Sequence, residues 1–188
     1  MCGRYRFGEE TAIFIDRSFK AYNSISSVGD ITPGMSPIIL SGREQTVKAE
    51  NMLWGMENKG SMIINARAES VHEKPMFASS IKSRRIIIPA QYFYEWDSEK
   101  NKVSFALPES NIIYLAGFYN MVNNRDAFVI LTTAANESME RVHDRMPLII
   151  GENDIDDWIY ESGKTDEFLH GTMPQLRSWQ DYEQLSFA

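Results

Sequence analysis

Residues 92–135, YFYEWDSEKNKVSFALPESNIIYLAGFYNMVNNRDAFVILTTAA, decide the fold class of this chain. They contain four short segments rich in β-branched and aromatic residues, namely YFYEW, KVSFALP, NIIYLAGFYN and AFVILTTAA. Polar residues of the kinds that favour turns separate these segments. Because short strands at such spacing usually pair with their neighbours in the chain, the stretch predicts a mostly antiparallel sheet or an open β-barrel.

The segments on either side of this stretch add helices and further strands. Acidic residues in a first turn and apolar residues at helical spacing predict an amphipathic helix over residues 9–23. PIIL and TVKAEN, on either side of SGRE, predict a hairpin over residues 37–51. We expect further strands within residues 61–70, 85–90 and 145–150, and helices at residues 72–84, 136–144 and 153–162.

The chain is expected to fold as one unit. No repeat, low-complexity tract or linker divides its 188 residues. We therefore predict a single α+β domain over residues 1–188, built on the mostly antiparallel sheet or open β-barrel with flanking helices. The motifs discussed below span residues 2–150, and residues 151–188 are expected to form an acidic helical C-terminal extension of the same domain.

Composition excludes several classes of protein. A hydrophobic content of 43% suits a globular core, and no apolar run approaches the roughly 20 residues that span a bilayer. One cysteine excludes an intramolecular disulfide and a thiolate-rich zinc site. The first residues, with Arg4 and Arg6, do not resemble a signal peptide. We expect a cytoplasmic location, no membrane association, no metal and no cofactor.

The charge is divided unevenly along the chain. The net charge is −7, which argues against a polycation that coats nucleic acid regardless of sequence. Residues 1–100 hold 13 Lys or Arg against 12 Asp or Glu, whereas residues 101–188 hold 6 against 14. The acidic excess is concentrated in 151–168, so a local arginine patch remains compatible with the N-terminal half.

Cys2 is the first candidate for chemistry. A buried lone cysteine usually acts as a small hydrophobe, but a position next to a terminus is rarely deep in a core. Loss of Met1 would place a free α-amine and a thiol on one residue. The amine can form an imine with an aldehyde, after which the thiolate closes a thiazolidine ring; alternatively the thiol attacks an acyl carbon.

Glu95, in YFYEW, is the second candidate. Strand alternation places it on the same face as Phe93 and opposite Tyr92, Tyr94 and Trp96. Two interpretations stand: an exposed strand position, or a general acid or base in an apolar pocket.

His143 and Asn65 are the remaining candidates. His143, in RVHDRMP, precedes a predicted strand and would exchange protons near neutral pH, unless Asp144 merely caps a turn there. In NARAES, Asn65 and Arg67 share one side of a strand. An amide can orient an amine or a carbonyl, and a guanidinium binds phosphate; a turn asparagine and a surface arginine are the alternative.

Taken in order, these pieces resemble one known family. MCGRY, DITPG, WGM, NARAES, RRIIIPAQYFYEW, LAGFY, ILTTAAN and HDRMPLII together resemble the SOS-response-associated peptidase (SRAP) family. The resemblance runs from Cys2 to about residue 150, and the last 38 residues match only loosely. One departure stands out: the family usually has Asp-Gly where this sequence has Gln91 and Tyr92.

The resemblance implies a sensor of abasic sites in single-stranded DNA. Cys2, freed of Met1 by a self-processing peptidase activity, would end as a thiazolidine cross-link to the ring-opened sugar, and a lyase-like activity is also implied. Asn65 would orient the Cys2 amine, Glu95 would move protons, and His143 would assist ring opening and reversal. The implied DNA contacts are Arg4, Trp54, Arg67, Trp96 and Arg145.

Three other functions remain open at this point. An N-terminal-nucleophile amidohydrolase, such as a class II glutamine amidotransferase domain, also begins Met-Cys-Gly, but it leaves FYEW and HDRMP without roles. A peptidase acting on other proteins is suggested by the family name. A non-catalytic single-stranded DNA-binding protein would retain its function without Cys2. The sequence indicates no protein partner.

Overall fold

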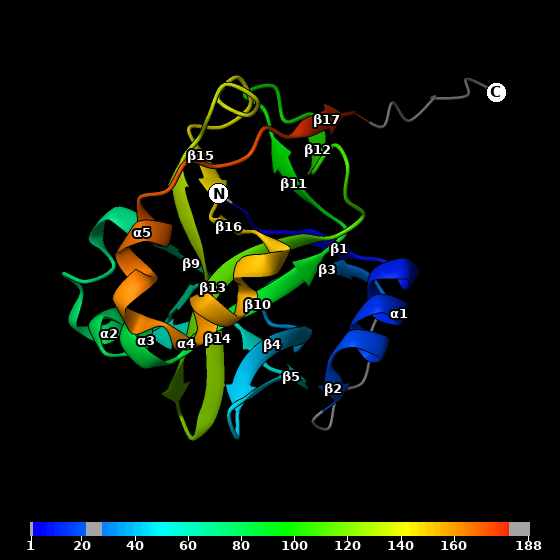
Figure 1. The fold of residues 1–188 in the computed structure, drawn as a ribbon. Coiled ribbons are helices and arrows are strands. Elements are labelled where there is room, and N and C mark those ends of the chain that lie inside the picture. The colour runs from blue at the N-terminus through cyan, green and yellow to red at the C-terminus, as the bar shows by residue number, and fades with distance from the viewer. Residues whose placement is uncertain (1, 22–27, 181–188) are drawn as a thin grey trace.

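Antiparallel pairing dominates the computed structural model, which describes residues 2–21 and 28–180 (Figure 1). Within these residues a ten-stranded sheet has the order β15-β14-β13-β10-β4-β5-β2, with β16 on β13 and with β6 and β9 on β14. A five-stranded sheet has the order β17-β12-β11-β1-β3, and β7 pairs with β8. Both sheets are open, so the α+β class built on mostly antiparallel sheet is confirmed and no barrel closes among the described strands.

The strands of the larger sheet have these bounds: β2 Lys20–Ala21, β4 Ile38–Arg43, β5 Thr46–Asn51, β6 Leu53–Trp54, β9 Asn65–Arg67, β10 Arg85–Ala90, β13 Ile113–Val122, β14 Arg125–Ala134, β15 Arg145–Pro147 and β16 Ile149–Ile150. The smaller sheets contain β1 Tyr5–Phe7, β3 Gly29–Ile31, β11 Tyr92–Trp96, β12 Lys102–Ala106, β17 Arg177–Trp179, β7 Met56–Asn58 and β8 Ser61–Ile63.

Tight turns set the register of the two longest hairpins. Asn123 and Asn124, between β13 and β14, have φ values of 51° and 59°. Two consecutive left-handed residues match the twist of the flanking strands, and asparagine tolerates that conformation better than most residues. Glu44 and Gln45, with φ values of 52° and 62°, join β4 to β5 in the same way, which confirms the hairpin expected at 37–51.

One face of the five-stranded sheet packs into the core, and on the other face Tyr94 and Ser104 are also buried. Phe93 and Phe105 stack face to face at 5.4 Å between ring centroids, and Tyr5 and Phe7 of β1 are also fully buried. These side chains contribute to the same core as the apolar residues of β10, β13 and β14. The period-two alternation places the intervening residues of β1, β11 and β12 on the opposite face.

Short helices cover the flanks. The α-helices are α1 Glu9–Ser18, α2 Pro75–Ala78, α3 Ser80–Ser83, α4 Ile155–Tyr160 and α5 Thr165–Leu169, and the 3-10 helices are η1 Ala68–Ser70, η2 Glu152–Asp154 and η3 Ser162–Lys164. Figure 1 shows α2 to α5 on one side of the molecule and α1 on the other. None of the helices in the described ranges is long and apolar enough to cross a membrane.

One expectation for the C-terminal half is wrong, and a second holds for only part of its range. Residues 137–142 form turns rather than a helix. The N–H groups of Met139 and Val142 donate to carbonyls three residues earlier, and the i→i+4 bonds at Glu140 and His143 are isolated, so no consecutive helical series forms. After α5 the chain forms strand β17, which pairs with the edge strand β12, so the C-terminal segment is only partly helical. Residues 181–188 lie outside the described part.

Candidate functional site

The N-terminal segment, from Cys2 to Phe7, runs antiparallel to β11. Tyr5 pairs with Phe93, and the Tyr94 N–H donates to the Arg4 carbonyl at 3.0 Å. The antiparallel direction therefore carries the chain start toward the C-terminal end of β11, where Glu95 lies. Cys2 is 1% exposed, so its position next to the terminus does not leave it on the surface.

Cys2 and Glu95 are electrostatically coupled. Burial raises the pKa of the Cys2 thiol far above its usual range, and the negative charge of Glu95 raises that pKa further. Glu95 itself is 3% exposed, on the same face as the fully buried Phe93. The interpretation of Glu95 as a group in an apolar pocket is thus the one that matches its burial, and the thiol beside it is protonated at neutral pH.

Asn65 holds the backbone of Cys2. Strand β9 lies parallel to β14, with Asn65 opposite Ile130, and the Asn65 Nδ2 donates to the Cys2 carbonyl at 3.2 Å. The Asn65 Oδ1 is buried and has no hydrogen-bond partner among the described residues. Since a buried acceptor without a donor is costly, this oxygen suits an N–H group arriving beside Cys2. Ala66 is buried on the opposite side and Arg67 is exposed, as the alternation predicts.

His143 lies in the loop between β14 and β15. Its Nδ1 accepts the Arg145 backbone N–H at 2.9 Å, and the Asp144 Oδ1 lies 2.9 Å from the same nitrogen. Because Nδ1 accepts the Arg145 N–H, the proton of the neutral ring lies on Nε2, which leaves Nε2 as the donor of this side chain.

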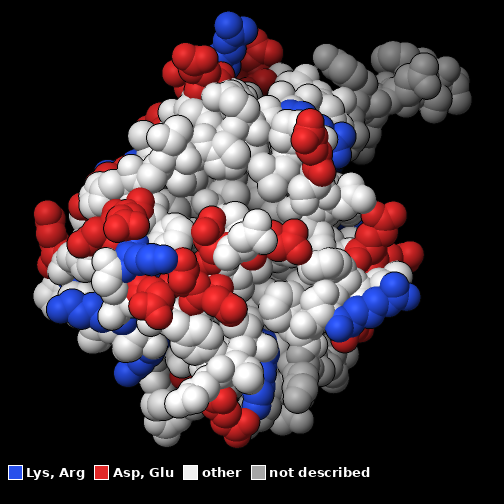
Figure 2. Space-filling model, in the orientation of Figure 1, with Lys and Arg blue, Asp and Glu red and all other residues white. Residues whose placement is uncertain are grey.

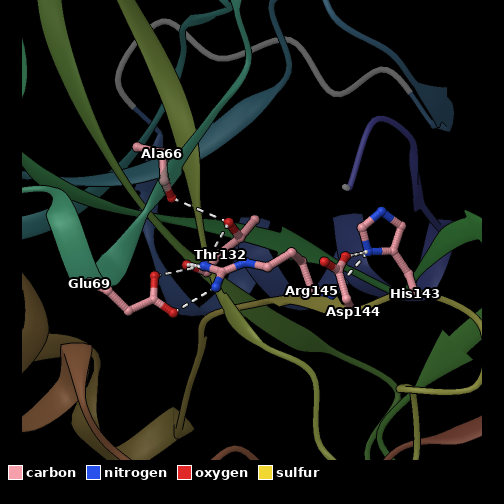
Figure 3. Close-up of polar contacts among 6 residues, drawn as sticks. All are labelled: Ala66, Glu69, Thr132, His143, Asp144 and Arg145. Atoms are coloured by element: carbon pink, nitrogen blue, oxygen red, sulfur yellow. Dashed lines mark hydrogen bonds and ion pairs between the residues drawn. The ribbon is translucent and has the colours of Figure 1, made fainter.

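Arg145 is engaged by a carboxylate, a contact that the sequence did not indicate. Figure 3 shows its guanidinium pointing toward Glu69 and away from His143. The two terminal nitrogens of the Arg145 guanidinium donate to the Glu69 carboxylate oxygens at 2.6 and 2.8 Å, and Nη2 also donates to the Thr132 carbonyl at 2.6 Å. These bonds hold the pKa of Glu69 below its usual range. The expected phosphate contact of Arg145 would therefore have to replace this ion pair.

The two tryptophans expected at DNA occupy different environments. Trp96 is the last residue of β11 and is 36% exposed. The Arg4 guanidinium carbon lies 5.6 Å from the centroid of the Trp96 ring. Trp54 is fully buried, stacks on Phe128 at 6.1 Å and donates from Nε1 to the Ile64 carbonyl. The assignment of Trp54 to a DNA contact is corrected, because a ring enclosed in the core presents no face to a strand.

Comparison with known proteins gives the family. The model of the SOS response associated peptidase (SRAP) family matches residues 1–185. The chain belongs to the SRAP family. Abasic site processing protein YoqW of Bacillus subtilis is 29% identical to this SRAP chain over 193 residues, covering 92% of it and 86% of YoqW. Abasic site processing protein YedK of Escherichia coli is 25% identical over 147 residues, which cover 72% of this chain and 66% of YedK.

Solved structures share the fold of this SRAP chain. A crystal structure of a protein from Bordetella bronchiseptica superposes with a TM-score of 0.78 at 20% identity, covering 95% of this chain and 99% of the other. One from Bacteroides thetaiotaomicron gives 0.76 at 19% identity, covering 95% and 91%. The overall fold of this chain therefore recurs in these solved structures.

Proposed function

We propose that this protein captures abasic sites in single-stranded DNA by forming a thiazolidine cross-link at Cys2. The observation that carries the proposal is the arrangement around that residue: the Asn65 amide holds its carbonyl, and Glu95 acts on its buried thiol. The relatives YoqW and YedK are named abasic site processing proteins, which supports the same substrate. The proposal requires removal of Met1, and we assign the family's peptidase activity to this self-processing.

The proposed reaction consumes only the two functional groups of Cys2. An abasic deoxyribose in its open form presents an aldehyde, which the Cys2 α-amine attacks. Loss of one water gives an imine. The thiol then adds to the imine carbon, its proton passes to the imine nitrogen, and the thiazolidine ring closes. Neither an oxidant nor a reductant is needed.

The neighbouring side chains have separate roles in this scheme. The unpartnered Asn65 Oδ1 would accept a hydrogen bond from the Cys2 amine. Glu95 would take and return protons during imine formation and thiol addition, because it is buried and its charge acts on the thiol. His143, fixed by the Arg145 N–H, would protonate the sugar ring oxygen during opening and assist reversal.

Positive groups around Cys2 would hold the strand. Arg4 and the exposed Arg67 are the proposed phosphate contacts, and Trp96 offers a ring face next to Glu95. An abasic site has no base to read, so backbone charge and covalent capture must provide recognition. Arg145 would join them where phosphate displaces Glu69.

An abasic oligonucleotide tests the proposal. The wild-type chain is expected to form an adduct that survives heating in denaturant. Cys2→Ala keeps an N-terminal amine but has no thiol, so it should give no heat-stable adduct while borohydride still traps its imine. Intact-mass measurement of the unreacted proteins verifies Met1 removal in both.

Three outcomes would contradict the mechanism. A heat-stable adduct from Cys2→Ala, or from a chain that retains Met1, would show that the thiazolidine is not the product. Release of ammonia from glutamine without any DNA adduct would favour the amidohydrolase instead.

A further inference from the structure

The side of the five-stranded sheet that is turned away from the core carries aromatic and cationic residues in register, around the buried Tyr94 and Ser104 at its centre. Cross-strand pairing aligns Trp96 with Lys102, Tyr94 with Ser104 and Trp179, and Tyr92 with Arg6. We call this side the outer face and define it by Arg6, Tyr92, Trp96, Lys102, Arg177 and Trp179. The residues between them, such as Phe93 and Phe105, point into the core.

The rings of the outer face form a connected series. Arg177 lies 5.1 Å above the Trp179 ring, and Trp179 meets Tyr92 edge to face at 5.2 Å. Tyr92 in turn contacts Tyr94 at 5.3 Å, and Lys102 lies 5.0 Å from the Tyr94 ring centroid. Trp96 is 36% exposed and Arg177 is exposed. Tyr92 stands where the family usually has glycine, so this chain supplies a ring that a glycine would not.

The charge of the outer face opposes that of the molecule. Its strands carry the cations Arg6, Lys102 and Arg177, and Arg4 lies against Trp96 beside them. Among the strand residues on this face Asp30 is acidic, and it lies 3.5 Å from Arg6. The whole chain has a net charge of −7. Figure 2 shows acidic residues gathered instead over the region of α4 and α5. An acidic protein that keeps cations beside aromatic rings on one sheet face selects for a polyanion with flat groups.

We infer that the outer face binds the undamaged single-stranded DNA that flanks the captured site. Bases would stack on Trp179, Tyr92 and Trp96, and phosphates would contact Arg177 and Lys102. Trp96 and Arg4 connect this face to the Cys2 site: Trp96 ends β11 next to Glu95, whose side chain lies on the opposite face of the strand, and the Arg4 guanidinium lies 5.6 Å from the Trp96 ring centroid. The choice of DNA rests on the proposed function, but stacking on this face requires no aldehyde and no thiol.

Tryptophan fluorescence can report this binding directly. The chain contains four tryptophans, and Trp54 and Trp158 are fully buried. Quenching by an oligothymidylate of about 12 nucleotides, a length within the site sizes of stacking platforms, would therefore arise from Trp96 and Trp179. We expect saturable quenching by this strand, which contains no abasic site, and much weaker quenching by the same sequence in a duplex.

Two variants test the assignment of residues. Trp179→Ala should weaken binding about tenfold, within the range for loss of one stacked base. Arg177→Gln removes an exposed cation that lies against the Trp179 ring, and it should lower the slope of log affinity against log salt by about 0.7. Arg125→Gln is the matched control, because Arg125 is an exposed arginine at the start of β14, away from this sheet.

The outcomes separate this inference from the proposed function. Unchanged affinity in both Trp179→Ala and Arg177→Gln, or an equal loss in Arg125→Gln, overturns the inference even where the abasic cross-link forms. Weaker binding in Trp179→Ala and a smaller salt dependence in Arg177→Gln, with Arg125→Gln unchanged, support the inference even where no cross-link forms. Duplex binding as tight as single-strand binding overturns it as well, since paired bases cannot stack on the rings.

Discussion

The Cys2 thiol is buried beside a carboxylate, and both features oppose its ionisation. Burial is the larger cause of its raised pKa, and the charge of Glu95 is the second. A thiol in this state is a poor nucleophile until a proton acceptor is available. In the proposed reaction, the same carboxylate that disfavours the thiolate would also accept the thiol proton, so Glu95 would couple deprotonation to the arrival of an imine.

This coupling predicts opposite effects of Glu95→Gln on two reactions. Removing the negative charge lowers the pKa of Cys2, so a small alkylating agent should modify the thiol faster at a given pH. Cross-linking to an abasic strand should slow by about a hundredfold, because the proton acceptor is lost. Iodoacetamide labelling and adduct formation, each followed over a range of pH, measure the two rates.

Glu9→Gln provides the matched control for this variant. Glu9 is an exposed glutamate in the first turn of α1, so its replacement should change neither rate. Parallel slowing of alkylation and cross-linking by Glu95→Gln would show that Glu95 acts through the fold of the pocket rather than through its charge.

The sequence predicted the strand face of Glu95, but neither the burial of Trp54 nor the partner of Arg145. The alternation in YFYEW correctly placed Glu95 with Phe93, because strand periodicity depends on local sequence alone. The burial of Trp54 depends on Tyr5 and Phe128, which are distant in sequence, and the partner of Arg145 is Glu69, 76 positions earlier. Such contacts form only when the sheet brings β9, β14 and β15 together.

At the scale of elements, a single buried arginine joins the C-terminal helices to the sheet. Arg85, at the start of β10, donates from its guanidinium to the carbonyls of Ile81, Lys82, Trp158 and Ile159. These carbonyls lie at the ends of α3 and α4, where helices have unpaired acceptors and a partial negative charge. Desolvation lowers the pKa of Arg85, so these acceptors must compensate its burial.

Arg85→Met is therefore expected to destabilise the protein by about 3 kcal/mol or more, because it leaves several buried carbonyls without donors. Arg17→Met, at an exposed position in the last turn of α1, should change the free energy of unfolding by less than about 0.5 kcal/mol. Denaturant unfolding of the two variants and the wild type measures the difference. Equal stabilities of the two variants would mean that solvent replaces the arginine at these helix ends.

Elements with local signals were predicted better than those set by tertiary pairing. The β4–β5 hairpin and the β13–β14 strands follow from apolar segments around polar turns. Strand β17 has little apolar periodicity of its own and forms because β12 offers an unpaired edge. Residues 137–142 have helical composition, but Asn136 donates to the carbonyls of Met173 and Pro174, which ties this segment to the C-terminal chain.

At the scale of the whole molecule, charge and aromatic groups are sorted onto different faces. Acidic residues gather over the region of α4 and α5 (Figure 2), whereas Arg4 and Arg177 lie against the rings of Trp96 and Trp179. This separation lets a protein of net charge −7 present a local attraction for a polyanion. The uneven charge along the sequence indicated the acidic region, whereas the outer face required the register of four strands.

Buried acids of high pKa also determine how the whole fold responds to alkali. Burial raises the pKa of Cys2 and of Tyr5 above their usual values, so both groups are protonated in the folded state. A raised folded-state pKa contributes stability in full below the unfolded-state pKa and loses it above. Since unfolded thiols and phenols titrate near about 8.5 and 10, the free energy of unfolding should be flat near neutral pH and fall beyond about pH 8.5.

Each of these groups contributes a slope of up to about 1.4 kcal/mol per pH unit above its unfolded-state pKa. Cys2→Ala should remove the part of the decline that begins near the thiol pKa, and Tyr5→Phe the part that begins near the phenol pKa. Denaturant unfolding at a series of pH values from neutral to alkaline measures both slopes. Because Tyr5 and Cys2 are each fully enclosed, declines in the two variants as steep as in the wild type would show that water reaches these groups before the fold opens.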